Sequence, residues 1–176
     1  MNIAVYLGSS MGKDPTMKEM TQKVGEWLAE NHHTLVYGGA RNGLMGVVAD
    51  SVIAHGGHVI GVIPQFLEEK EQAHDNLDEL HIVDTMAERK TMMIELADAF
   101  ITMPGGPGTL EEVSEIISKI RLGQLSGPCI LFNLHHYYDP LKAQIDQMIT
   151  FGYVDASIYD AVFFLSSMDE LKQIIK

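Results

Sequence analysis

The sequence predicts one α/β domain built as a doubly wound parallel sheet with helices on both faces. Short runs typical of β-strands alternate with longer segments of helical periodicity, which is the pattern of a parallel sheet. The 176 residues fit the usual single-domain range of about 100–200 residues. Hydrophobic residues make up 46% and charged residues 20%, a globular composition that excludes extended disorder.

The first half of the chain starts with a buried strand, and its helices carry clear end signals. Asp14 supplies an N-cap, and Pro15 follows at the first helical position. Gly56 and Gly57 form a C-cap pair that ends a second helix. We expect strands at residues 3–7, 34–37 and 59–63, and helices from residue 15 and over residues 43–55.

The second half continues the alternation after an unusually polar stretch. Residues 65–79 are the most polar part of the chain and predict a mobile connection over the surface, which is a candidate lid. No repeat or linker interrupts the remainder of the chain. We expect strands at residues 80–83, 99–103, 129–132 and 162–165, and helices at residues 85–97, 110–122 and 141–150, with a short helix at the end.

Charge and composition exclude several classes of protein. The chain has 12 basic and 24 acidic residues, a net charge of −12, which argues against nucleic-acid binding. It lacks a signal-peptide pattern and any apolar run near the ~18 residues of a membrane span. The lone Cys129 cannot form an internal disulfide, so we expect a cytoplasmic protein. An anionic ligand then needs a local positive feature to bind.

Three glycine-rich turns follow predicted strands and predict a phosphate cradle. Ligands of such sheets bind beyond the carboxyl ends of the strands, where glycines allow close approach and helix N-termini offer free N–H groups. The alternative is that these glycines only form tight turns. No G-x-G-x-x-G pattern or Walker A ending is present, which disfavours dinucleotide and P-loop binding. The candidates are Gly8, Ser9, Gly38, Gly39, Gly105, Gly106 and Gly108.

Arg89 is an unusual residue on an otherwise apolar helix face. Thr85 and Glu88 form a capping box that starts the helix. Arginine is rarely buried without a partner, and a cation near a helix N-terminus is disfavoured. Either Arg89 has a functional role, or its stem lies along the stripe and its charge reaches solvent. The stripe is formed by Met86, Met93 and Leu96.

Glu112 is the glutamate of the following helix that is directed toward the carboxyl edge of the sheet. It lies at the border of the apolar stripe, whereas Glu111 and Glu115 are expected to face water. Thr109 and Glu112 also have the spacing of a capping box, which gives Glu112 a structural alternative. The pattern leaves both roles open.

These motifs resemble those of the Lonely Guy (LOG) family, the cytokinin riboside 5′-monophosphate phosphoribohydrolases, often mislabelled lysine decarboxylases. The run Pro104-Gly-Gly-Pro-Gly-Thr-Leu-Glu-Glu112 is similar to the family signature P-G-G-x-G-T-x-x-E. Met86-x-x-Arg89-Lys90-x-x-Met93 resembles its second signature. Further similarities are Gly8-Ser9-Ser10, Gly38-Gly39 with Gly43-Leu-Met-Gly46, and Tyr137-Tyr138-Asp139, so that the resemblance spans nearly the whole chain.

The resemblance implies a Rossmann-like homodimer that hydrolyses purine nucleoside 5′-monophosphates to free base and ribose 5-phosphate. Arg89 and Glu112 correspond to the catalytic pair of the family, and no metal or cofactor is implied. The nucleotide-binding positions correspond to Met86, Lys90, Gly105, Gly106, Gly108 and Thr109. Leu7 stands where many members have cysteine, and Ala87 where plant enzymes usually have histidine. Neither is expected to touch the catalytic pair, but Ala87 lies close to Arg89 in the sequence and leaves the base preference open.

The residue chemistry agrees with this assignment. Cleavage of a glycosidic bond develops positive charge on the ribose, which a carboxylate such as Glu112 stabilises, and it requires an activated water. Arg89 then either holds that carboxylate ionised or contacts the phosphate. The alternative function is a nucleotide- or cofactor-binding protein without catalysis. The eight histidines show no metal-binding spacing, and nothing marks a cofactor-binding lysine for decarboxylation.

Overall fold

A computed structural model describes the chain from Met1 to Lys176, apart from the side chains of Glu69 and Glu71. Within this part the strands form one seven-stranded sheet, in which every pairing is parallel and the order is β4-β3-β2-β1-β5-β6-β7. The Rossmann-like, doubly wound α/β fold expected from the sequence is confirmed. The strands are β1 (Asn2–Tyr6), β2 (Thr34–Tyr37), β3 (His58–Pro64), β4 (Glu79–Val83), β5 (Ala99–Thr102), β6 (Cys129–Phe132) and β7 (Val162–Leu165).

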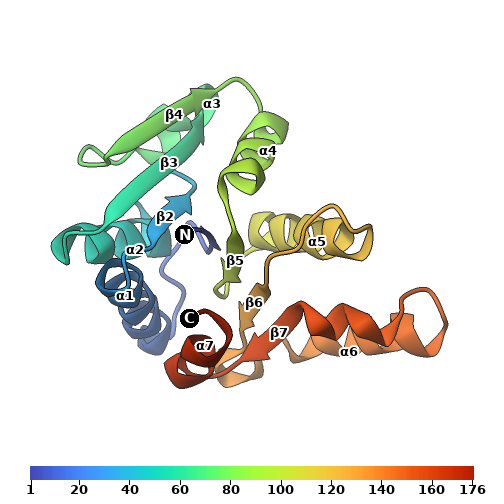
Figure 1. Cartoon of the computed structure of the whole chain (residues 1–176). Helices are drawn as coiled ribbons and strands as arrows, with labels where there is room; N and C mark the ends of the chain where they lie inside the picture. Colours follow the sequence, from blue (N-terminus) through green and yellow to red (C-terminus); the bar gives the residue numbers. More distant parts are fainter.

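Helices cover both faces of the sheet, with α1 and α2 on one side and α4 and α5 on the other (Figure 1). The alternation of side chains along β1 serves both layers, because Ile3 and Val5 face α1 and α2 whereas Ala4 and Tyr6 face α4 and α5. The helices are α1 (Pro15–Glu30), α2 (Gly43–Ala54), α3 (Gln65–Glu71), α4 (Met86–Leu96), α5 (Pro107–Arg121), α6 (Asp139–Thr150) and α7 (Met168–Ile174), with short turns η1 (Leu134–His136) and η2 (Ala156–Asp160).

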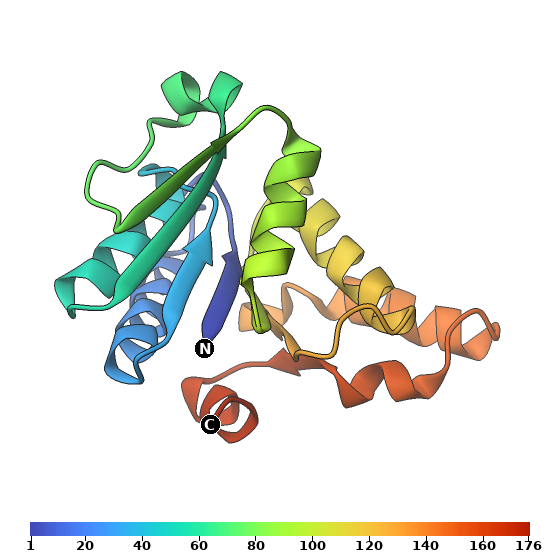
Figure 2. The same cartoon turned by 45° about the horizontal axis from the view of Figure 1, so that its top comes forward.

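The strand order reverses between β1 and β5. The chain first builds outward from β1 through β2 and β3 to β4, then returns to add β5 on the other side of β1. Tyr6 and Thr102 are register partners at the ends of these two strands, so their following loops leave the sheet at the same level. Figure 2 shows α4 and α5 side by side next to this point. In such sheets the reversal is where a ligand crevice opens.

The expected helix starts are mostly confirmed. Asp14 caps α1, and its Oδ1 accepts a hydrogen bond from the Thr16 N–H at 2.9 Å. Thr85 caps α4 by accepting from the Glu88 N–H at 3.1 Å. The Glu88 carboxylate accepts from the Asp84 N–H at 2.9 Å, so the reciprocal half of the capping box is displaced by one residue.

Two expectations about irregular segments are wrong. The polar stretch 65–79 does not start as a surface connection, because its first residues form α3 directly after Pro64. Helix α5 begins at Pro107 rather than at residue 110, since proline is favoured at the first helical position. Thr109 therefore lies inside the first turn and is not the N-cap. The second half of the polar stretch is held by a bridge between Ala40 and Ala73.

None of the helices that the structure describes combines the length and the apolar character needed to cross a membrane.

Candidate functional site

A pocket opens at the strand reversal, above the ends of β1 and β5. It is bounded by the β1–α1 loop, the end of β2, helix α4 and the first two turns of α5. The sequence-predicted residues that line it are Ser9, Gly38, Met86, Arg89, Gly106, Gly108, Thr109 and Glu112. The structure therefore brings together both proposed catalytic residues and most of the proposed binding residues.

Arg89 is buried beneath this pocket, with 5% of its surface exposed. Its Nε donates to the carbonyl oxygen of Val62 at 3.1 Å, and its Nη2 donates to that of Gly38 at 3.0 Å. The thioether sulfurs of Met86 and Met45 lie 3.9 and 4.0 Å from the Nη atoms. Two carbonyls at strand ends thus fix the plane of the guanidinium, so the alternative that its charge reaches solvent is wrong.

Gly38 provides the space for this arginine. A Cβ atom at position 38 would lie 1.8 Å from Arg89 Nη2 and 2.8 Å from the sulfur of Met45. Gly39 follows with φ of +77°, a backbone conformation that favours glycine. The two glycines predicted to approach a ligand are thus already required by the protein, because they seat Arg89 and turn the chain after β2.

The β1–α1 and β5–α5 loops touch one another. A Cβ atom on Gly105 would lie 2.2 Å from Thr109 Oγ1 and 3.0 Å from the Gly8 nitrogen. A Cβ atom on Gly8 would in turn lie 3.5 Å from the Gly105 Cα atom. Gly8 and Gly105 are therefore packing glycines, which hold the two loops together without lining the pocket themselves.

Gly106 and Gly108 differ from those glycines because nothing in the protein explains them. A Cβ atom at either position would meet no atom within 4 Å, and neither has a positive φ. Among the described residues, the backbone N–H groups of Gly106, Gly108 and Thr109 have no protein acceptor. Free amides at the start of a helix carry partial positive charge and bind anions. This loop is therefore the candidate for the local positive feature that an acidic protein needs to hold an anion.

Glu112 projects into the same pocket from the second turn of α5. Because the helix is capped at Gly106 and not at Thr109, the predicted capping box does not form. Tyr6 lines the pocket beside it. Burial, and next the nearby Glu112 carboxylate, raises the pKa of Tyr6 well above its usual value, so this phenol stays protonated.

Lys90 does not line this pocket, and the nucleotide-binding role that the resemblance implies for it stays a prediction. Its Nζ contacts Glu111 Oε1 at 2.8 Å and Glu115 Oε2 at 3.1 Å. Hydrogen bonds to Glu111 and Glu115 raise the pKa of Lys90. Glu115, expected to face water, is instead partly covered by this lysine. The ion pairs join α4 to α5 and so connect the helices that carry Arg89 and Glu112.

Sequence reasoning assigned no role to Tyr6 or Leu67, which line the pocket, and it left Met45, together with Met92 and Met93, as a candidate for either an adenine pocket or a dimer interface. Tyr6 is the last residue of β1, and the alternation of the strand could have placed its side chain on the α4–α5 face. Met45 lies at the start of α2 and contacts Arg89. Leu67 belongs to α3, and the polar composition around it gave no signal.

Comparisons with known proteins agree with the motifs. A family model described as "Possible lysine decarboxylase" matches residues 45–175. The chain is 41% identical over 154 residues to a cytokinin riboside 5′-monophosphate phosphoribohydrolase of Rhodococcoides fascians, covering 87% of this chain and 78% of that protein. It is 42% identical over 152 residues to one of Arabidopsis thaliana, covering 86% and 70%. The chain belongs to the LOG family.

Solved structures share the fold of this LOG-family chain at low identity. The molybdenum cofactor binding protein from Rippkaea orientalis superposes with a TM-score of 0.73 at 22% identity, covering 99% of this chain and 97% of that one. The molybdenum cofactor carrier protein from Chlamydomonas reinhardtii gives 0.72 at 18% identity, covering 99% and 96%. These likenesses show a common fold alone.

The two departures from the LOG pattern lie in different environments. Leu7 is buried and lines the pocket, whereas Ala87 is exposed on α4 and is not part of the lining. Leu7 is therefore the departure that lies at this pocket, whereas the expected effect of Ala87 on base preference stays a prediction.

Proposed function

We propose that this chain hydrolyses the N-glycosidic bond of purine nucleoside 5′-monophosphates, of the adenosine or cytokinin type, to free base and ribose 5-phosphate. One observation carries the proposal: Arg89, Glu112 and the unbonded amides of the β5–α5 loop line the same pocket. The membership in a family whose named relatives are phosphoribohydrolases supports it.

Each part of the pocket has a role in this reaction. The amides of Gly106, Gly108 and Thr109 hold the phosphate. The bond between ribose C1′ and the purine nitrogen breaks, and a water oxygen bonds to C1′. Glu112 takes the proton of this water and stabilises the positive charge on the ribose, while the departing base takes up a proton.

Apolar side chains offer a wall for the base. Leu67, Met45 and Met93 line the pocket together with Met86, and thioethers adapt well to the face and edge of an aromatic ring. The guanidinium of Arg89, fixed by two carbonyls, supplies positive charge at the floor of the site. Its charge favours binding of a phosphorylated substrate.

The direct test incubates the purified protein with AMP and with isopentenyladenosine 5′-monophosphate, and measures free base by chromatography. Release of base supports the proposal, and the faster substrate identifies the preferred base. Adenosine serves as the control, because it lacks the phosphate and is expected to react far more slowly. Nucleotides that bind but stay intact would instead establish a binding protein without catalysis.

Gly108→Ala is expected to separate binding from stability. A methyl group at this open position in the first turn of α5 makes no clash, and replacing glycine in a helix gains up to about 1 kcal/mol. Gly108 lines the pocket, so we expect the added methyl group to lower the affinity for ribose 5-phosphate, measured by calorimetry, at least about tenfold.

Gly123→Ala is the matched control for this substitution. Gly123 also faces open space, but its φ of +68° strains an alanine. We expect a lower melting temperature with unchanged affinity, the reverse of the pattern at position 108. Full affinity in Gly108→Ala would contradict the placement of the phosphate.

We also propose that two copies associate through α5 and α6, in the cytoplasm. Ile117, Ile145 and Tyr153 line an apolar groove between these helices, and Phe151 and Tyr153 are largely exposed. Soluble monomers rarely expose a contiguous apolar patch of this kind. Sedimentation is expected to show a dimer that Tyr153→Lys dissociates, and a monomeric wild-type chain would contradict the proposal.

The proposed cytoplasmic location is supported by the single cysteine. Cys129 is free and buried, which suits a reducing compartment.

A further inference from the structure

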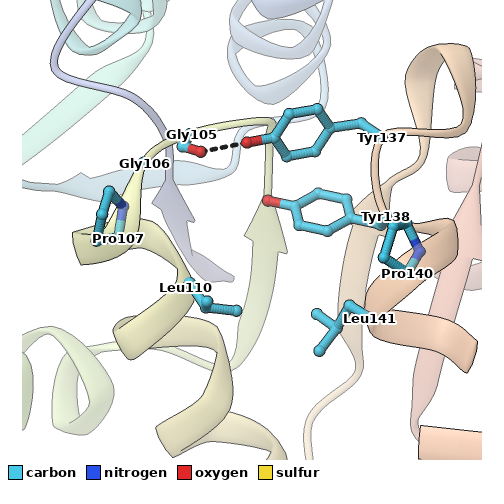
Figure 3. A pocket seen from close by; sticks show the side chains of 8 residues that line it. All are labelled: Gly105, Gly106, Pro107, Leu110, Tyr137, Tyr138, Pro140 and Leu141. Atoms are coloured by element: carbon cyan, nitrogen blue, oxygen red, sulfur yellow. Dashed lines mark hydrogen bonds between the residues drawn. The ribbon is translucent and has the colours of Figure 1, made fainter. Parts of the chain in front are cut away.

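The β5–α5 loop separates two cavities. One is the proposed nucleotide pocket, and the other lies between this loop and the start of α6. Gly106 and Pro107 line both. Figure 3 shows the second cavity, where Tyr137 and Tyr138 extend toward the loop from the segment before α6. The Tyr137 hydroxyl donates a hydrogen bond to the carbonyl oxygen of Gly105, drawn as a dashed line.

This hydrogen bond sets the orientation of the Gly105–Gly106 peptide. The peptide bond is trans, and in a planar trans peptide the C=O and N–H groups point in opposite directions. With the Gly105 oxygen held toward Tyr137, the N–H of Gly106 is turned away from the tyrosine, to the side of the nucleotide pocket. That N–H has no acceptor within the described chain.

Two neighbouring glycines make this peptide dependent on an external constraint. Glycine allows a wide range of backbone conformations, so a Gly–Gly peptide does not select one orientation by itself. Pro107 follows and contributes no N–H, which leaves Gly106 as the first amide of the cradle. An anion site that includes this amide gains from any contact that fixes the plane of the peptide.

The segment that carries Tyr137 is itself anchored. His135 Nε2 lies 2.9 Å from Thr16 Oγ1 and 3.3 Å from Asp14 Oδ2, at the start of α1. His135 and His136 both have positive φ values, 49° and 62°, a conformation that costs non-glycine residues energy. The rings of Tyr137 and Tyr138 pack edge to face at 5.0 Å. The segment thus contacts the start of α1 through His135 and the β5–α5 loop through Tyr137.

We propose that Tyr137 is a positioning residue, which aligns the Gly106 N–H with the substrate phosphate by holding the Gly105 carbonyl. This inference rests on the proposed function, because it assigns the phosphate to this loop. Tyr137 does not touch the substrate, so its effect must depend on the phosphate and not on the base.

Tyr138 offers a matched control in the same loop. Its hydroxyl donates to the Met103 carbonyl oxygen at 2.8 Å. The peptide nitrogen that follows Met103 belongs to Pro104, which has no N–H to orient. Tyr138 is 5% exposed and Tyr137 is 47% exposed. Loss of the Tyr138 hydroxyl therefore leaves a buried carbonyl without its donor, whereas water replaces the Tyr137 hydroxyl.

The test compares Tyr137→Phe and Tyr138→Phe by calorimetry with ribose 5-phosphate and with adenosine, and by thermal melting. For Tyr137→Phe we expect the Kd for ribose 5-phosphate to rise about tenfold, with adenosine binding and the melting temperature nearly unchanged. For Tyr138→Phe we expect the opposite pattern, a lower melting temperature with unchanged Kd for ribose 5-phosphate. A merely structural role of Tyr137 would not produce a phosphate-specific loss.

The outcomes distinguish this inference from the proposed function. If the wild type binds and hydrolyses AMP but Tyr137→Phe binds ribose 5-phosphate as tightly, the role of Tyr137 is overturned and the activity stands. If the wild type binds ribose 5-phosphate without hydrolysing AMP, and Tyr137→Phe still loses affinity, the positioning role stands without the activity. A wild type that does not bind ribose 5-phosphate overturns the positioning role, and the release of base from AMP then decides the proposed function separately.

Discussion

Glu112→Gln is expected to abolish the release of free base while nucleotide affinity survives. The amide has nearly the shape of the carboxylate, but it neither accepts the proton of the attacking water nor carries the negative charge that stabilises the ribose. General base catalysis contributes about 10²–10⁴-fold, so we expect turnover to fall at least about 10³-fold when both roles are lost. The side chain lines the pocket, and α5 is capped at Gly106 rather than at Thr109.

Glu111→Gln is the matched control on the same helix. Glu111 precedes the catalytic candidate by one residue, but its carboxylate contacts Lys90 outside the pocket and is largely exposed. Glu115 still holds Lys90 in this variant. We expect its turnover to stay within about threefold of the wild type, since exposed ion pairs contribute little. Chromatography of AMP incubations measures both variants, and a Glu112→Gln enzyme within tenfold of wild type would contradict the assigned role.

Arg89→Lys is expected to lower turnover about 10²–10³-fold although the charge is kept. The guanidinium donates to the carbonyls of Val62 and Gly38 from one plane, and it still has N–H groups left for the pocket. An ammonium group offers no planar fork, so it cannot hold both carbonyls and present a fixed charge to the substrate. Steady-state kinetics with AMP is the measurement.

A second variant displaces the Arg89 guanidinium without replacing the residue. Gly38→Ala places a methyl group 1.8 Å from the Nη2 position, so the guanidinium must leave its seat. We expect Gly38→Ala to reproduce the kinetic loss of Arg89→Lys. Arg121→Lys, at the exposed end of α5, is the control and is expected to retain wild-type turnover. Normal kinetics in both Arg89→Lys and Gly38→Ala would show that the reaction does not use this arginine.

The fold was predictable because its signals are local. The apolar runs of the strands, the Asp14 cap and the glycines after α2 each act within a few residues, and the structure has all of them. Helix α3 was missed because its polar composition resembles that of a loop. The start of α5 was misplaced because Pro107 begins a helix as readily as it ends a turn.

The site was only partly predictable because several roles depend on contacts between distant segments. The sequence indicated that Arg89 and Glu112 are unusual, but it does not show that Gly38 makes room for Arg89. Lys90 follows Arg89 directly, yet it binds the outer carboxylates of α5, a contact set by the packing of two helices.

The seating of Arg89 on Gly38 also has an evolutionary meaning. Any side chain at position 38 would occupy the volume of the guanidinium, so the two positions form one steric unit although 51 residues separate them. Relatives that gain a side chain at the position of Gly38 are then expected to have lost the arginine as well. Covariation of this pair would separate relatives of the LOG family that retain the buried arginine from relatives that have lost it together with the glycine.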